Sequence, residues 1–107
     1  MVNFVLLYTG GKMGANEAEQ KKALQDWNTW YGKLGTALVD GGHSFSDRIK
    51  FVERDGSVRD GPVDGCDLAS GYTIIKADSL NRAAELAKGC PVLHDGGKIS
   101  IYETRAM

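Results

Sequence analysis

His43 lies three residues after Asp40, with two glycines between them. A histidine within reach of a carboxylate is the usual composition of a general acid/base pair, because imidazole changes charge near neutral pH. Both residues follow the first expected helix, at an end where ligands often enter a helix/sheet cleft. They are candidate catalytic residues, and the competing interpretation is an exposed loop histidine.

The same pairing recurs at His94 and Asp95, in an equivalent turn after the second expected helix. The second helix is short and leaves less room for a pocket. Two equivalent His/Asp junctions are more typical of a shared turn geometry than of two active sites. The pair at His43 is therefore the stronger candidate.

Three aromatic residues, Trp27, Trp30 and Tyr31, fall within one stretch of the first expected helix. Aromatic side chains between a helix and a sheet suit a flat, partly apolar ligand. Their helical spacing favours core packing for Trp27 and Tyr31, whereas Trp30 lies off the centre of the apolar stripe and is expected to line a pocket. The expected pocket-lining residues are Trp30, Trp27, Tyr31, Tyr8, Tyr72 and Asp60.

Phosphate, metal and redox sites find little support in the sequence. The loop from Thr9 to Met13 lacks the glycine spacing and the Ser/Thr of a phosphate-binding loop. Clustered aspartates at positions 55, 60, 64 and 67 fit no calcium motif, and aspartate is a common turn residue. Cys66 and Cys90 lack the spacing of a zinc site or of a disulfide framework. We expect no cofactor, no metal and two free thiols in the cytoplasm.

Composition and charge describe an ordinary globular domain. The chain has 107 residues, 42% of them hydrophobic, and a net charge of -1, which excludes a disordered tail and a coiled coil. No run of basic residues is present, so nucleic acid is not an expected partner. The apolar start, Val2 to Tyr8, is too short to cross a membrane. One domain over residues 1–107 is expected.

The order of elements predicts an α+β fold. Strands are expected at 2–8, 48–52, 71–77 and 98–104, and helices from a cap at Asn16 to about Val39 and from Asp78 or Ser79 to about 88. Asp55-Gly56 predicts a hairpin turn, and residues 57–67 read as a loop. Gly32 and Gly35 fall inside the first expected helix, which favours close packing against its last turns. This order is typical of a ferredoxin-like βαββαβ unit with a four-stranded antiparallel sheet.

The first and third expected strands are apolar on both faces. Two helices can cover only one face of a four-stranded sheet, so the other face would stay exposed in a monomer. A homodimer that packs the two sheets face to face removes this exposure. We therefore expect a dimeric α+β barrel.

Taken together, several short motifs resemble the YCII-related (DGPF-type) domain family. They are Trp30-Tyr31 with Leu34-Gly35, Leu38 to Gly42, Asp55-Gly56, Asp60-Gly61-Pro62, Gly71-Tyr72, Asp78-Ser79-Leu80 with Ala83, and Gly89-Cys90-Pro91 with Gly96-Gly97. The resemblance covers nearly the whole chain and implies a dimeric α+β barrel. It also implies, for some members, acid/base chemistry by a histidine on the first helix with an aspartate, on muconate-like, lactone or chlorinated ring-cleavage compounds.

The chain departs from that family pattern at two places. Its first expected helix contains no histidine, and Val63 stands where the DGPF signature has phenylalanine. The family's catalytic pair therefore has no counterpart, and His43 with Asp40 could replace it only if their loop folds back over the pocket.

Two functions remain open from the sequence. The first is a cytoplasmic homodimer that binds a small, partly apolar acid or lactone in a helix/sheet cleft, with lyase or isomerase chemistry at His43. The second is a non-catalytic binding or protein-interaction module. The volume of the cleft discriminates between them, since a cavity of several hundred Å³ favours a small-molecule ligand.

Overall fold

The computed structural model describes residues 1–10, 16–46, 48–61 and 68–105. Its strands are β1 (Val2–Thr9), β2 (Leu38–Asp40), β3 (Ile49–Val52), β4 (Val58–Gly61), β5 (Ala69–Ala77) and β6 (Lys98–Glu103). Its α-helices are α1 (Glu17–Leu34) and α2 (Leu80–Ala87), and short 3-10 helices follow them at Gly35–Ala37 and Pro91–Asp95. The expected α+β class is confirmed.

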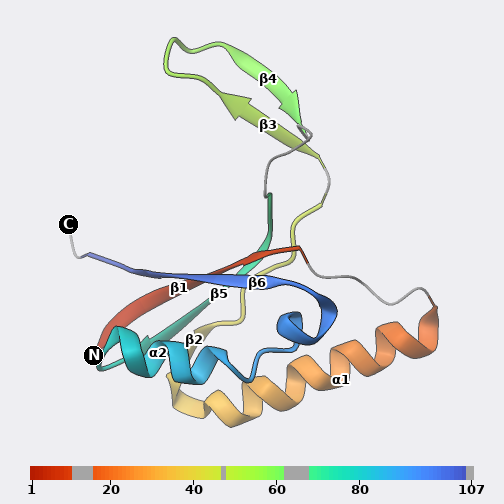
Figure 1. Cartoon of the computed structure of the whole chain (residues 1–107), viewed down its shortest axis with the longest axis vertical. Coiled ribbons are helices and arrows are strands. Elements are labelled where there is room, and N and C mark those ends of the chain that lie inside the picture. Colours follow the sequence, from red (N-terminus) through yellow and green to blue (C-terminus); the bar gives the residue numbers. More distant parts are fainter. Residues whose placement is uncertain (11–15, 47, 62–67, 106–107) are drawn as a thin grey trace.

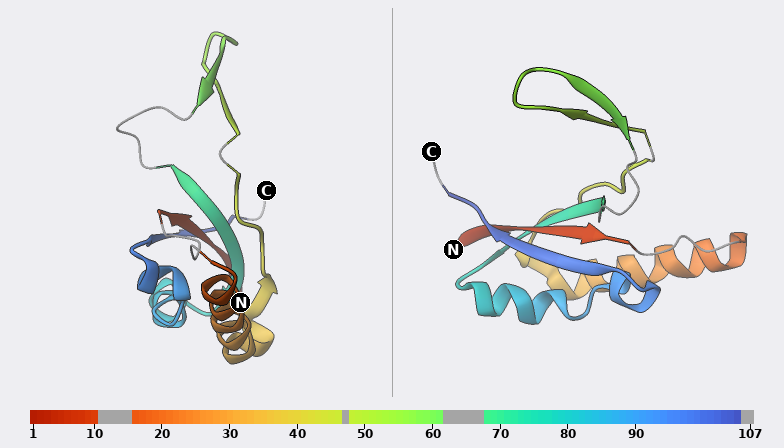
Figure 2. Two further views of the ribbon diagram at one scale, coloured as in Figure 1. Left: turned by 90° about the vertical axis from the view of Figure 1, so that its right-hand side faces the viewer. Right: turned by 45° about the horizontal axis from the view of Figure 1, so that its top comes forward.

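Four strands form one antiparallel sheet in the order β2-β5-β1-β6. Both helices lie against one face of it, and the hairpin β3–β4 projects from the other side (Figure 1; Figure 2). Side chains of β1 alternate strictly, so Phe4, Leu6 and Tyr8 are buried under the helices while Val5 and Leu7 are half-buried on the opposite face. This opposite face is called the open face below.

The helix α1 begins as the sequence predicts and ends earlier. The side chain of Asn16 accepts a hydrogen bond from the backbone N–H of Glu19 at 2.9 Å, which confirms the expected cap. The helix stops at Leu34 because Gly35 takes a left-handed φ of 55°, and residues beyond it form a 3-10 turn and then β2. The expected close packing against Gly32 and Gly35 is wrong, since a Cβ at either position would meet nothing within 4 Å.

The strand expected near 48–52 exists as β3, but it does not join the main sheet. It pairs only with β4, through a turn in which Gly56 has a φ of 88° and Asp55 accepts a hydrogen bond from the N–H of Ser57. The expected hairpin turn is thereby confirmed. The expected loop over 57–67 is wrong at 58–61, which form β4, and residues 62–67 lie outside the described part. The edge of the main sheet beside β5 is β2 instead.

The core lies between the sheet and the helices. Phe4, Leu6 and Ile75 have no exposed surface, and Ala83 and Ala87 present a small-residue face of α2 to the strands. Small side chains let a helix approach a sheet closely, so α2 packs tightly although it is only two turns long. Neither described helix is long and apolar enough to cross a membrane.

Candidate functional site

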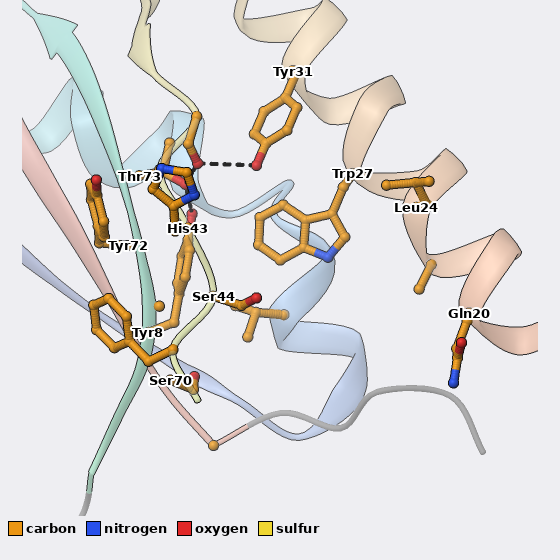
Figure 3. Close-up of a pocket in the computed structure, with 17 residues that line it drawn as sticks. Tyr8, Gln20, Leu24, Trp27, Tyr31, His43, Ser44, Ser70, Tyr72 and Thr73 are labelled. Carbon is orange, nitrogen blue, oxygen red and sulfur yellow. Dashed lines mark hydrogen bonds between the residues drawn. The ribbon is translucent and has the colours of Figure 1, made fainter. Parts of the chain in front are cut away.

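A cavity of about 680 Å³ lies between the N-terminal half of α1 and the segment that follows β2 (Figure 3). That segment, residues 41–45, continues alongside β5 after β2 ends. Phe45 donates its N–H to the carbonyl of Ser70 at 2.8 Å, and Tyr72 donates its N–H to the carbonyl of His43 at 3.2 Å. These bonds hold the segment along the edge of β5, where its residues line one side of the cavity.

Close approach to β5 requires glycine in this segment. Gly42 has a φ of 75°, and a Cβ there would overlap the carbonyl oxygen of Tyr72. A Cβ at Gly71, on the facing strand, would lie 2.9 Å from the carbonyl oxygen of His43. The two glycines together set how near the segment lies to the sheet.

Aromatic rings form much of the cavity wall. Trp27 stands in the middle of it, with its ring 5.4 Å from that of Tyr8 and 5.9 Å from that of Tyr31 (Figure 3). Tyr72 belongs to a second cluster on the open-face side of β5, where its ring lies 6.2 Å from His43 and 5.9 Å from Phe45. A flat, apolar molecule on the helix-facing side would contact the rings of Trp27 and its neighbours.

A chain of hydroxyl groups lies behind the rings. Tyr8 donates to the hydroxyl oxygen of Thr73 at 2.6 Å, and Thr73 donates to the carbonyl of Gly41 at 3.0 Å. Tyr31 donates to the same carbonyl at 3.2 Å. Burial raises the pKa of both tyrosines, the hydrogen bonds with Thr73 opposing it in part, so both phenols are neutral over the physiological range.

His43 and Asp40 do not form the expected pair. The ring of His43 lines the cavity, but Asp40 is outside the lining and its Oδ1 accepts a hydrogen bond from the N–H of Gly42 at 2.9 Å. Among the described residues, no hydrogen bond or ion pair joins the two side chains. Asp40 shapes the turn that presents His43, and no carboxylate among the residues with described positions is hydrogen-bonded to the imidazole.

Of the two tryptophans expected to line the pocket, Trp27 does so and Trp30 does not. Trp30 is 3% exposed and lies in the core, where its Nε1 donates to the carbonyl of Leu86 at 3.1 Å, and it does not line the cavity. Trp27, whose spacing favours the core but which is also among the expected pocket-lining residues, forms the cavity wall. The reason is α2: it covers the side of α1 that carries Trp30, and Gly89 closely approaches that indole.

Asp60 also lies away from the cavity. It is on β4 of the projecting hairpin, where its carboxylate accepts a hydrogen bond from Nζ of Lys50 at 2.6 Å. Both side chains are largely exposed, so this ion pair contributes little to stability. Tyr8, Tyr31 and Tyr72 do line the cavity, as the sequence suggests.

The other candidate positions stand apart from the cavity or outside the described residues. His94 is exposed in the 3-10 helix after α2, and Cys90 is a free, fully buried thiol whose pKa burial raises. Gly10 of the Thr9–Met13 loop lines the cavity, while residues 11–13 and Val63, Asp64, Cys66 and Asp67 are not described. Within the described ranges, no three His, Cys, Asp or Glu residues gather to hold a metal.

Thr73, Ser44, Ser70 and Phe45 line the cavity without having been expected to. Only Thr73 leaves a signal in the sequence. It alternates with Ile75 and Ala77 on the helix-facing side of β5, and a hydroxyl at a core position needs a hydrogen-bond partner. The other three belong to chain neighbours whose pairing across residues 44–71 no local pattern indicates.

Comparison with known proteins adds no further assignment to this geometry. The chain matches no protein-family model, and it matches no curated protein.

Proposed function

We propose that this protein binds a small, flat, partly apolar molecule, of the acid or lactone class, in the cavity between α1 and residues 41–45. The observation that carries the proposal is the cavity itself, about 680 Å³ in volume and lined by ring faces and hydroxyl groups. A volume of several hundred Å³ is typical of small-molecule sites. The tryptophan that could have filled the space, Trp30, is committed to the core.

A catalytic step at this site would depend on His43. His43 supplies the imidazole of the described lining, and imidazole is a common general acid or base, so a lyase or isomerase step would use it to move a proton. Asp40 gives it no support. The resemblance to the YCII-related family favours such chemistry. The alternative, a non-catalytic binding module, is favoured because Asp40 is hydrogen-bonded to the backbone of Gly42 and not to His43.

A homodimer is part of the same proposal, with the ferredoxin-like, dimeric α+β barrel as its architecture. The order β2-β5-β1-β6, with β3–β4 as an insertion, supports the ferredoxin-like arrangement. The open face supports the dimer, since no helix of the described part of the chain covers Val5, Leu7 and Ile74 there. The free buried thiol of Cys90 supports a reducing location such as the cytoplasm.

A thermal-shift screen with aromatic acids, lactones and muconates tests the binding proposal. A ligand at a hundredfold excess over its dissociation constant should raise stability by about 2.7 kcal/mol. Two variants of one helix localise the effect: Ala23→Phe places a ring in the cavity, and Ala18→Phe makes the same change at an exposed position of α1. We expect the shift to disappear in the first and to persist in the second.

The contrary result is equally clear. If no compound shifts the transition, or if Ala23→Phe and Ala18→Phe respond alike, the cavity is not a binding site. For catalysis, His43→Ala should abolish turnover of any substrate found, while its affinity changes little. Full turnover by that variant would leave only binding.

A further inference from the structure

We propose that the ligand of this cavity carries a hydroxyl group on a flat ring, and that this hydroxyl donates a hydrogen bond to the phenol oxygen of Tyr31. The inference rests on the proposed binding function and makes it more specific. It follows from the direction in which the hydroxyl groups of the inner wall are hydrogen-bonded.

A carbonyl oxygen can only accept hydrogen bonds, so Gly41 determines the direction of the whole chain. Thr73 must donate to it, and therefore accepts from Tyr8, while Tyr31 donates to the same carbonyl. All three hydroxyl hydrogens are thus committed inside the protein. The capacity that this wall keeps for a ligand consists of oxygen lone pairs.

Tyr31 is the accessible acceptor of the three. Thr73 has no exposed surface and Tyr8 is 4% exposed, whereas Tyr31 is half-buried and its ring lines the cavity. Figure 3 shows the Tyr31 hydroxyl at one end of the cavity, beyond Trp27. Its oxygen donates to Gly41, and the neighbouring hydroxyl of Thr73 donates to the same carbonyl, so a lone pair of the Tyr31 oxygen remains for a ligand. A ligand hydroxyl that ends beside this oxygen would complete its hydrogen bonding.

The lack of charged side chains in the described lining also favours a neutral hydroxyl group on the ligand. None of the described lining residues is Lys, Arg, Asp or Glu. A carboxylate placed against Tyr31, Thr73 and Tyr8 would face lone pairs without a cation, and burying it there would be costly. A neutral hydroxyl meets neither penalty.

The far end of the same ligand reaches a different environment. Ser44 lies opposite Gly71, two residues before Thr73 along β5, which corresponds to about 7 Å. The hydroxyl of Ser44 has no hydrogen-bond partner among the described residues, so it is free to donate to a carbonyl or ester oxygen. An aromatic ring that lies against Trp27 extends along this part of the wall, with one end toward Tyr31 and the other toward Ser44. The ligand is therefore a hydroxylated aromatic ester, lactone or acid, with the hydroxyl at the Tyr31 end.

Two neutral probes of the same shape test the hydrogen-bond direction. Methyl para-hydroxybenzoate can donate from its hydroxyl, and methyl para-methoxybenzoate can only accept. Binding is measured by NMR titration, with the indole N–H signal of Trp27 reporting on the cavity and that of Trp30 as a reference in the core. We expect the hydroxy ester to bind about fivefold more tightly, as one neutral hydrogen bond allows.

Tyr31→Phe removes the acceptor and keeps the ring. Thr73 still satisfies the carbonyl of Gly41 in this variant, so the fold should survive. The two esters should then bind with affinities within about twofold of each other. Tyr102→Phe, which removes an exposed phenol on β6, should leave the preference of the wild type unchanged.

The outcomes separate this inference from the proposed function. Equal binding of the two esters by the wild type, or a preference that persists in Tyr31→Phe, overturns the donor assignment while the cavity remains a binding site. Failure of every ester, acid and lactone to bind overturns the binding function itself, and this inference falls with it.

Discussion

Tyr8 joins the core to the cavity. Its ring packs edge-on against Trp27 and its hydroxyl donates to Thr73, yet only 4% of its surface is exposed. Burial is the largest influence on the phenol, and it raises the pKa of Tyr8 far above that of a free tyrosine. The folded protein therefore holds this phenol in its neutral form in conditions under which the unfolded chain would ionise it.

This difference makes stability depend on alkaline pH. The folded-state pKa of Tyr8 lies above the unfolded value of about 10, so its contribution is complete below that pH and is lost as the pH rises above it. The loss should approach 1.4 kcal/mol per pH unit, as for any single blocked ionisation, at about pH 11. Urea unfolding of the wild type and of Tyr8→Phe between about pH 8 and 11 measures it.

The phenylalanine variant should be less stable at neutral pH by about 1 kcal/mol, because it lacks the hydrogen bond to Thr73. Its disadvantage should shrink above about pH 10, because it has no phenol at this position to ionise. Cys90 and Tyr31, whose pKa values are also raised by burial, are present in both proteins and contribute to both curves. Parallel curves over the whole range would show that Tyr8 ionises freely in the fold.

Trp27 and Trp30 show how far single residues can be placed from sequence. Their spacing correctly indicates one apolar side of a helix, and both indeed pack toward the sheet. Which of the two is buried depends on α2, whose Leu86 carbonyl accepts the indole N–H of Trp30. That contact joins positions 56 residues apart, and helical periodicity carries no information about it.

At the scale of elements, residues 41–45 determine the cavity. The segment has little secondary structure of its own and is held by backbone hydrogen bonds to β5 and by the turn at Asp40. Gly42 permits this contact, because its φ is 75° and any Cβ would overlap the carbonyl oxygen of Tyr72. The position of residues 41–45 at the cavity therefore depends on Gly42, where a side chain cannot be accommodated.

Gly42→Ala should destabilise the fold by several kcal/mol, about 1–2 of them from the left-handed backbone and the remainder from the collision with Tyr72. Gly56→Ala is the matched control, since Gly56 has a φ of 88° with open space around its Cβ position. It should lose only the backbone part. Chemical denaturation of both variants measures the difference in their free energies of unfolding. Equal losses of stability would mean that residues 41–45 move to accommodate the added methyl group at little cost.

The strand at the edge of the main sheet, beside β5, was not predicted correctly from the sequence. Alternation at 48–52 is genuine and does predict β3, but alternation does not say which strand is the partner. The true edge, β2, has three residues, and it follows a helix that ends at Leu34, about five residues before the expected end near Val39. A strand this short produces no periodic signal, so its identity depends on the pairing of Leu38 with Ile75.

At the scale of the whole molecule, the chain is extended for its size. Its radius of gyration is 15.3 Å, against about 13 Å for a compact domain of this length. The hairpin β3–β4 accounts for the difference, because it projects from the body and packs chiefly on itself (Figure 2). An isolated two-stranded hairpin is marginally stable in water. Together with the open face, it leaves a large surface that a second copy would cover.

The open face carries two rows of cross-strand neighbours. One row is Tyr102, Val5 and Ile74, and the other is Ser100, Leu7 and Tyr72. If two chains pack these rows together, Ile74→Asp places a carboxylate within the shared apolar layer, where its burial is unfavourable. Leu80→Asp makes a comparable change at an exposed position of α2, and an acidic residue is favourable in the first turn of a helix.

Light scattering coupled to size exclusion, at concentrations of about 10 µM, tests this packing. We expect the wild type and Leu80→Asp to elute with twice the mass of one chain, because each keeps the apolar rows intact. Ile74→Asp should elute with the mass of one chain and retain its circular dichroism, since Ile74 is half-buried in the monomer. A monomeric wild type would contradict the dimer, and a dimeric Ile74→Asp would move the interface elsewhere, with the projecting hairpin as the next surface to change.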